Sequence, residues 1–152
     1  TIQSLDLLGR KILGNNGATL KKFGKLIAAL IAEEGVNEQM AEFINPLAYL
    51  ADQMTKFTTE LGFKGFQNPD EVGAAAVDYM RVAGHLVFGY FWASMAQVAL
   101  QEIAAGNTDK FYVAKLQTAR FYFSKLFPET ATLMRCARSG AKSLMETEEA
   151  LA

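Results

Sequence analysis

The sequence contains few of the side chains from which metal sites and disulfides are built. Among its 152 residues there are one cysteine, Cys136, and one histidine, His85. A single cysteine excludes an internal disulfide and is typical of a reducing compartment, so we expect a cytoplasmic protein. A single histidine excludes the pair of Glu-x-x-His motifs that a di-iron helical bundle requires. We therefore predict that this chain has no metal site.

An excess of charge of one sign is also missing. The 15 Lys and Arg residues nearly balance the 16 Asp and Glu residues, and the formal net charge is -1. Nucleic acid binding requires a broad positive field, which this composition does not provide. We therefore predict that nucleic acid is not a partner.

Residues 82–101 carry no formal charge and form a stretch long enough to span a bilayer. The stretch also contains His85, Ser94 and two glutamines, and six of its residues are alanine or glycine. The neighbouring segments are amphipathic and need an apolar surface to cover. We therefore interpret the stretch as a buried central helix and predict no membrane span.

The hydrophobic pattern is helical throughout. Apolar residues make up 51% of the chain and recur every three or four residues along almost all of it. The predicted fold class is all-α, an antiparallel bundle like a four-helix bundle with one long central helix. At about 1.5 Å per residue that helix would exceed ~50 Å. A loop is expected at 62–67, and the predicted helices cover residues 1–13, 18–34, 38–61, 70–105, 108–126 and 129–145.

Three polar side chains are candidates for chemistry, and each has a simpler structural explanation. The nearest acidic residue on the helix that carries His85 is Asp78, one heptad away, which is too far to orient the ring as a general base. We therefore expect hydrogen bonds within the bundle to satisfy the ring of His85. Cys136 lies near two arginines that would lower the pKa of its thiol if they faced it, but a packing cysteine is the favoured interpretation. Ser94 lacks the glycine-containing turn that exposes the nucleophile of a serine hydrolase, so a structural role is the favoured interpretation.

A cluster of aromatic residues is more informative. Its members are too many for one inward stripe of a helix, so two explanations stay open. The bundle core is the leading one, and a hydrophobic interface with missing domains or a second subunit is the other. The cluster comprises Phe88, Tyr90, Phe91, Trp92, Tyr112, Phe121, Tyr122, Phe123 and Phe127.

Three segments carry a resemblance to a known family. Residues 1–11 read Thr-Ile-Gln-Ser-Leu-Asp-Leu-Leu-Gly-Arg-Lys, and residues 127–130, within the segment 111–145, read Phe-Pro-Glu-Thr. The first segment resembles the one that follows the Tyr-Glu-Gly-Thr motif in bacterial FAD-dependent acyl-CoA dehydrogenases. Residues 83–96 and 111–145 resemble the central and closing helices of an extra C-terminal helical domain. That domain occurs in the large subgroup similar to methylmercaptopropionyl-CoA dehydrogenase.

The resemblance implies a place within a larger enzyme. The chain begins with Thr1 rather than Met, and we expect it to be a piece of a longer protein. Residues 1–13 would end the preceding dehydrogenase helical domain, and residues 14–152 would form the appended bundle. The parent would oxidise an acyl-CoA to the 2-enoyl-CoA with FAD. The partners of this appended domain would be the remaining dehydrogenase domains and the sister subunits.

The family's catalytic base is a glutamate upstream of Thr1, so the resemblance implies no catalytic residue in this chain. Thr1 and Gln3 would lie near the FAD of the parent. We expect the isolated chain to be inactive and to hold no cofactor. The acyl-CoA substrate would be a partner of the parent enzyme.

An alternative hypothesis needs no parent enzyme. The chain could be a free-standing bundle that binds an apolar small molecule between the fourth and fifth helices. Such a pocket would be lined by residues such as Tyr90, Met95, Phe121 and Met134. A third possibility is an oligomerisation module.

Overall fold

The computed structural model describes residues 1–15 and 17–151, with side chains as far as residue 146. Its described residues contain helical elements and no strand, which confirms the predicted all-α class. The elements are α1 (Ile2–Leu5), the π-helical η1 (Asp6–Ile12), the 3-10 turn η2 (Leu13–Asn15), α2 (Ala18–Glu34), the 3-10 turn η3 (Glu38–Met40), α3 (Ala41–Gln67), α4 (Asp70–Ala104), α5 (Lys110–Phe121), the π-helical η4 (Tyr122–Leu126), α6 (Glu129–Ala137) and α7 (Lys142–Leu151).

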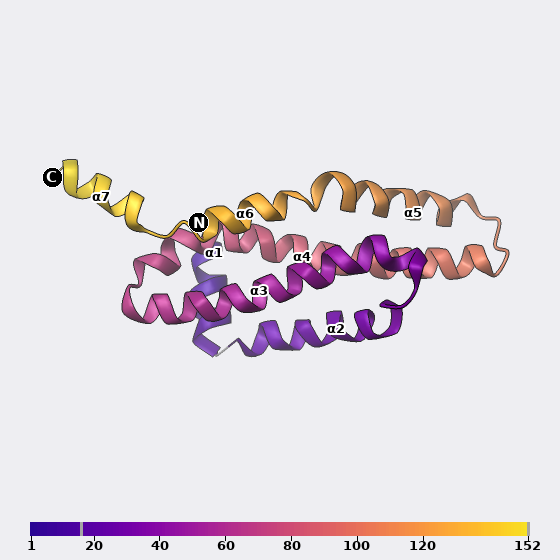
Figure 1. Cartoon of the computed structure of the whole chain (residues 1–152), viewed down its shortest axis with the longest axis horizontal. Coiled ribbons are helices and arrows are strands. Elements are labelled where there is room, and N and C mark those ends of the chain that lie inside the picture. Colours follow the sequence, from indigo (N-terminus) through magenta and orange to yellow (C-terminus); the bar gives the residue numbers. More distant parts are fainter. Residues whose placement is uncertain (16, 152) are drawn as a thin grey trace.

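The long helices form an antiparallel bundle around α4 (Figure 1). Helix α3 lies in front of α4, the row formed by α5, η4 and α6 returns along one side of it, and α2 lies along the other. The N-terminal α1 and η1 lie across the end of the bundle where α3 passes into α4. Helix α7 points away from the same end. The predicted bundle with one long central helix is thus confirmed, since α4 alone has 35 residues.

Helix α4 supplies the small side chains of the core. Its buried positions carry mainly alanine and glycine, so the neighbouring helices approach closely and contribute most of the large side chains. The buried residues of α4 are Ala75, Ala76, Tyr79, Val82, Leu86, Gly89, Ala93, Ala96 and Ala99. Those of α3 include Phe43, Leu47, Phe57 and Leu61. Among the described residues, no helix is both long enough and apolar enough to cross a membrane.

The loop expected at residues 62–67 is wrong, because α3 continues through them to Gln67. Gly65 explains the difference. A Cβ on this residue would overlap Val72 Cγ2, so glycine lets the end of α3 pack directly against the start of α4. The tertiary contact outweighs the low helix propensity of glycine, which on its own costs about 1 kcal/mol relative to alanine.

Two other helix boundaries also differ from expectation. The helix expected from residue 108 begins at Lys110, because the side chain of Asp109 caps it: Asp109 Oδ1 accepts from the Phe111 backbone N–H at 2.9 Å. The single helix expected over 129–145 is divided into α6 and α7. Gly140 adopts a φ of 80°, a left-handed conformation that ends helices. Glu71 Oε1 then accepts from the Ala141 N–H at 3.2 Å, which ties the break to the start of α4.

Gly89 is a site of close approach in the core, and it generates a stability prediction. A Cβ at this position would lie 2.7 Å from Phe127 Cε2 and 3.2 Å from Leu47 Cδ1. We expect Gly89→Ala to lower the free energy of unfolding by about 1–2 kcal/mol, because overpacking outweighs the gain in helix propensity. Urea denaturation followed by circular dichroism measures the change.

Gly73 provides the matched control in the same helix, since a Cβ there meets nothing within 4 Å. Gly73→Ala should leave stability unchanged or raise it by up to about 1 kcal/mol. Equal effects of the two substitutions would contradict the close approach at Gly89.

Candidate functional site

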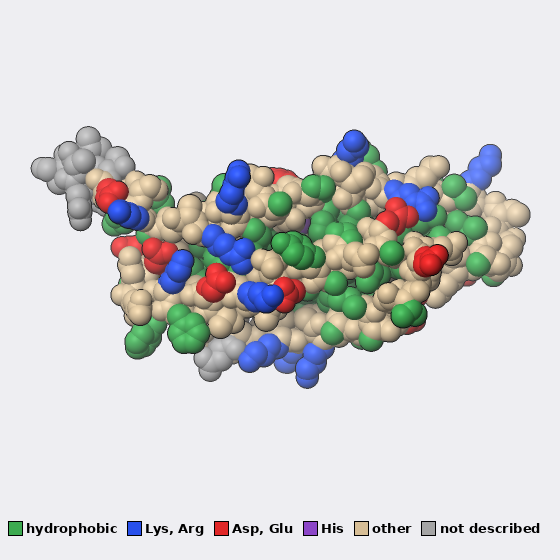
Figure 2. All heavy atoms as spheres, viewed as in Figure 1, with side chains coloured by type: hydrophobic (Ala, Val, Ile, Leu, Met, Phe, Trp, Pro, Cys, Tyr) green, Lys and Arg blue, Asp and Glu red, His purple; other side chains and the backbone are tan. Residues whose placement is uncertain are grey.

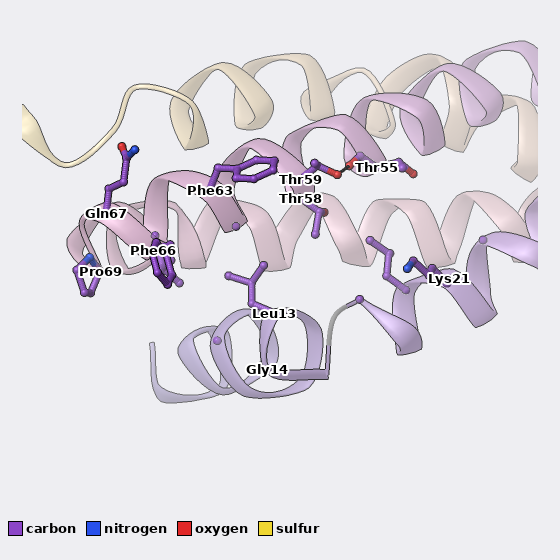
Figure 3. A pocket seen from close by; sticks show the side chains of 17 residues that line it. Leu13, Gly14, Lys21, Thr55, Thr58, Thr59, Phe63, Phe66, Gln67 and Pro69 are labelled. Carbon is purple, nitrogen blue, oxygen red and sulfur yellow. Dashed lines mark hydrogen bonds between the residues drawn. The ribbon is translucent and has the colours of Figure 1, made fainter.

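A large hollow lies between the N-terminal elements and the second half of α3. We call it the N-terminal hollow; it has a volume of about 1070 Å³. Figure 3 shows Leu13 and Phe66 facing each other across it, with Thr58 on α3 and the amine of Lys21 directed into the same space. Lys21 is the only charged residue in its lining. The full lining is Gly9, Leu13, Gly14, Gly17, Leu20, Lys21, Gly24, Thr55, Thr58, Thr59, Gly62, Phe63, Gly65, Phe66, Gln67, Pro69 and Val72.

The hydroxyl groups in this lining are already engaged. Thr55, Thr58 and Thr59 each donate to the carbonyl four residues earlier, at 2.9, 2.6 and 3.0 Å. The Thr58 hydroxyl also lies 2.7 Å from the Tyr79 hydroxyl. No acid–base pair lines the hollow. Its surface is suited to apolar contact and not to general acid–base catalysis.

Two phenylalanines at the rim of the hollow are unusually exposed. Phe63 retains 73% of its accessible surface and Phe66 retains 93%. Figure 2 shows hydrophobic side chains protruding at the lower left of the view, near the C-terminal end of α3. Burying an aromatic side chain is strongly favourable, so two exposed ones next to a hollow mark an interaction surface.

A second groove, of about 800 Å³, lies between α3, η4 and α6. Its floor includes Leu50, Phe123 and Met134, and two arginines line its edge. Of the four residues expected to line a pocket between the fourth and fifth helices, only Met134 lines either described hollow. The apolar spaces described here therefore flank α3, and do not lie where the sequence hypothesis placed one.

His85 lies in a small polar cluster between α4, η4 and α6. Its Nδ1 is 3.0 Å from the Tyr122 hydroxyl, and its Nε2 is 3.4 Å from Glu129 Oε2. Arg81 completes the cluster with an ion pair to Glu129. Both ring nitrogens of His85 thus have partners, and these partners join three helical elements. The cluster fixes the packing of α4 against η4 and α6.

Burial changes the ionisation of the tyrosine in this cluster. Tyr122 stacks on Trp92, with ring centroids 6.3 Å apart, and its side chain is buried in the bundle. Removal from water disfavours the charged phenolate, and burial raises the pKa of Tyr122 to about 12. Burial also raises the pKa of Tyr79, although its hydrogen bond with Thr58 acts in the opposite direction.

Cys136 and Ser94 have structural positions. Cys136 is exposed, so the prediction of a packing cysteine is wrong. The inward face of α6 is made by Thr130, Leu133, Met134 and Ala137, and Cys136 points to another side of that helix. The Ser94 hydroxyl donates to the Tyr90 carbonyl at 2.9 Å. Within the described residues, no group of three or more His, Cys, Asp or Glu side chains is placed to hold a metal ion.

The aromatic cluster has both buried and exposed members, so each of the two explanations that the sequence left open fits some of them. Tyr122, Phe123 and Phe127 are buried in the core. Phe88, Phe91 and Phe121 are exposed. The exposed members lie on α4 and α5, away from the N-terminal hollow.

The two residues predicted to approach a cofactor lie at the start of the chain. Thr1 precedes α1 and Gln3 lies within it, and both are exposed. The next residues turn inward, since Ser4 and Leu8 are buried against the bundle. No other predicted site residue is brought near them.

Comparison with known proteins places this helical bundle in a family. The family model described as "Acetyl-CoA dehydrogenase C-terminal like" matches residues 23–148. The chain is a C-terminal domain of the acyl-CoA dehydrogenase family. It is 30% identical over 131 residues to a 3-methylmercaptopropionyl-CoA dehydrogenase from Ruegeria pomeroyi. That alignment covers 84% of this chain and 22% of the relative, so this acyl-CoA dehydrogenase domain spans less than a quarter of that protein.

The raised pKa of Tyr122 predicts the alkaline behaviour of the domain. In the unfolded chain a tyrosine ionises near pH 10, whereas folded Tyr122 ionises near 12. The unfolded state therefore loses its proton first, and the free energy of unfolding falls as pH rises from about 10 to about 12. Tyr122→Phe should reduce this fall, and the remainder reflects Tyr79.

The measurement is the urea midpoint at a series of pH values from about 8 to about 11.5. At neutral pH, Tyr122→Phe should cost about 1 kcal/mol for the lost hydrogen bond to His85. The control is Tyr49→Phe, because Tyr49 is exposed. If Tyr122→Phe and Tyr49→Phe show the same alkaline loss as the unchanged chain, the assignment is wrong.

Proposed function

We propose that this chain is a non-catalytic domain that packs against the other domains and subunits of a cytoplasmic, FAD-dependent acyl-CoA dehydrogenase. The parent enzyme would oxidise an acyl-CoA to the corresponding 2-enoyl-CoA. The observation that carries the proposal is the apolar N-terminal hollow with its exposed Phe63 and Phe66. Such a surface, on a domain without a catalytic constellation among its described residues, supports a packing role.

The N-terminal segment supports the position of this contact. We propose that residues 1–13 end the preceding helical domain and that residues 14–152 form the appended bundle. Leu8 and Ile12 of η1 are buried in the core, so the junction between the two parts is held firmly. Gly9 and Leu13 of the same segment line the hollow. A dehydrogenase domain that continues from residue 1 would therefore lie near the hollow.

The residues present do not form a flavin site by themselves. Thr1 and Gln3 offer two exposed polar side chains on one turn, and the hollow offers one cation, Lys21. A flavin carries a pyrophosphate and a large ring system, which need more contacts than these. We propose that FAD is held by the preceding domains and that Thr1 and Gln3 only border it. The isolated chain would then be inactive.

The hollow also supports the alternative function, binding of an apolar small molecule. Its volume matches the larger ligand pockets of proteins, which reach about 1,000 Å³. Its apolar lining and single lysine suit a ligand with an apolar body and an acidic end. Titration of the isolated chain with a fluorescent fatty acid distinguishes the two functions, since a docking surface gives no saturable binding.

The packing role predicts the effect of charge at the rim. In the full-length enzyme that carries this chain, Phe63→Asp with Phe66→Asp should weaken the contact between domains, because an interface must desolvate both carboxylates. We expect faster proteolysis between the domains and at least about a tenfold loss of kcat/KM, equivalent to about 1.4 kcal/mol. The isolated chain should keep its stability, because both side chains are exposed.

The matched control is Val36→Asp, which places the same charge on a residue that is 95% exposed and does not line the hollow. It should leave the full-length enzyme unchanged. Wild-type proteolysis and activity in the double Phe variant would contradict docking through the hollow.

A further inference from the structure

A second apolar surface lies on α4, on a different side from its core residues. We call it the α4 seam, and its residues follow one another at alternating steps of four and three. They are Val77, Arg81, Gly84, Phe88, Phe91, Met95, Val98 and Glu102. This is the spacing of the a and d positions of a coiled coil, which lie on one side of a helix. The seam is apolar in its centre and has one charge toward each end.

Among the described residues, the apolar side chains of the seam are largely exposed, while Arg81 forms an ion pair with Glu129 and Glu102 accepts a hydrogen bond from Asn107. Phe88 and Phe91 retain 59% and 53% of their accessible surface, and Val98 retains 50%. In Figure 1, α3 lies in front of α4, the row of α5, η4 and α6 lies along one side of it, and α2 lies along the other. The core residues of α4, such as Val82, Gly89 and Ala93, point toward those neighbours. Helix α4 is thus apolar on two sides, of which the bundle covers one.

The order of residues along the seam is complementary to itself in the antiparallel direction. A register that places Phe88 opposite the partner's Phe91 also places Gly84 opposite the partner's Met95. Gly84 is an open position, since a Cβ there would meet nothing within 4 Å. A long, flexible methionine side chain fits such an opening. Because the pairing is two-fold, each of these contacts occurs twice.

The charges of the seam fit the same register. Arg81 and Glu102 lie near opposite ends of the seam, so antiparallel pairing brings Arg81 within one helical turn of the partner's Glu102. The two ion pairs that result flank the phenylalanine contacts. A parallel pair would place like charges side by side. From Val77 to Glu102 the seam extends over about 38 Å, more than three heptads, which is long enough for a coiled-coil contact.

We propose that two copies of this chain associate through the α4 seam as an antiparallel helix pair, with Phe88 and Phe91 at its centre. This helix pair would be the contact between sister subunits in the packing role proposed above. Its place in the parent enzyme rests on that proposed function. The seam and the N-terminal hollow are separate surfaces. A second copy and the dehydrogenase domains can therefore be bound at the same time.

The first experiment measures the mass of this chain by sedimentation velocity over a range of concentrations. The wild-type chain is expected to form a dimer, and Phe88→Asp with Phe91→Asp to be a monomer. The control is Phe63→Asp with Phe66→Asp, which changes two exposed phenylalanines outside the seam and should leave the dimer intact. Circular dichroism verifies that each variant is folded. A wild-type monomer at the highest soluble concentration, or a dimer that survives the seam variant, overturns the proposal.

A charge exchange tests the register. Arg81→Glu and Glu102→Arg should each raise the dimer dissociation constant by about tenfold, since each places like charges together at both ends. The combined variant, Arg81→Glu with Glu102→Arg, restores opposite charges and should return the constant to within about threefold of the wild type. Arg81 also forms an ion pair with Glu129, so the single variant Arg81→Glu changes more than the dimer contact. The recovery of the dissociation constant in the combined variant is therefore the decisive result.

Absence of recovery in a combined variant that remains folded overturns the antiparallel register. These results are independent of the full-length enzyme. A monomeric chain would refute association through the seam and leave docking through the hollow untouched. Failure of the hollow variants would leave the seam untouched.

Discussion

The rest of the structure depends on the close packing of α4 with its neighbours. Gly89 lets Phe127 and Leu47 approach the α4 backbone closely, and Ala93 and Ala96 are small residues buried on the same helix. Close contact of this kind maximises dispersion attraction and excludes voids. It also fixes where the other elements can lie. Because α4 contacts α1, α3, α5 and α6, its position constrains all of them.

Polar groups in the interior connect the helices of the bundle. Glu34, at the end of α2, is buried and accepts hydrogen bonds from Gln97 and Asn37, both at 2.7 Å. These bonds join α2, the following turn and α4. The cluster of His85, Tyr122 and Glu129 does the same at another place in the bundle. In each cluster the groups satisfy one another, as buried polar groups must.

The sequence predicted those features that depend on one helix at a time. The periodicity over 18–34 and the Asn68-Pro69-Asp70 start of α4 are local signals, and both helices begin within a residue or two of expectation. The errors arose where a distant residue decides. Gly65 indicated a loop, but its contact with Val72 keeps α3 helical. The α6 boundary needed the contact of Glu71 with Ala141, which no local pattern contains.

The candidate surfaces were harder to predict than the fold. Gly9, Gly24 and Gly62 line the hollow. In the sequence they indicate only a low helix propensity, and the fold alone brings them together. The sequence indicated that some rings of the aromatic cluster could be exposed, because the cluster has more rings than one inward stripe of a helix can hold. Which rings face outward depends on the direction from which α3 and η4 approach. That direction is a property of the assembled bundle.

Gly84 and Gly89 show how the two sides of α4 are related. They are five residues apart on the same helix and lie on different sides of it. At Gly89 the missing side chain admits Phe127 and Leu47 of the same chain. At Gly84 an added Cβ would meet no described atom within 4 Å. A glycine in the middle of a helix costs about 1 kcal/mol relative to alanine. Close packing offsets that cost at Gly89, and in the seam a side chain of a second copy can offset it at Gly84.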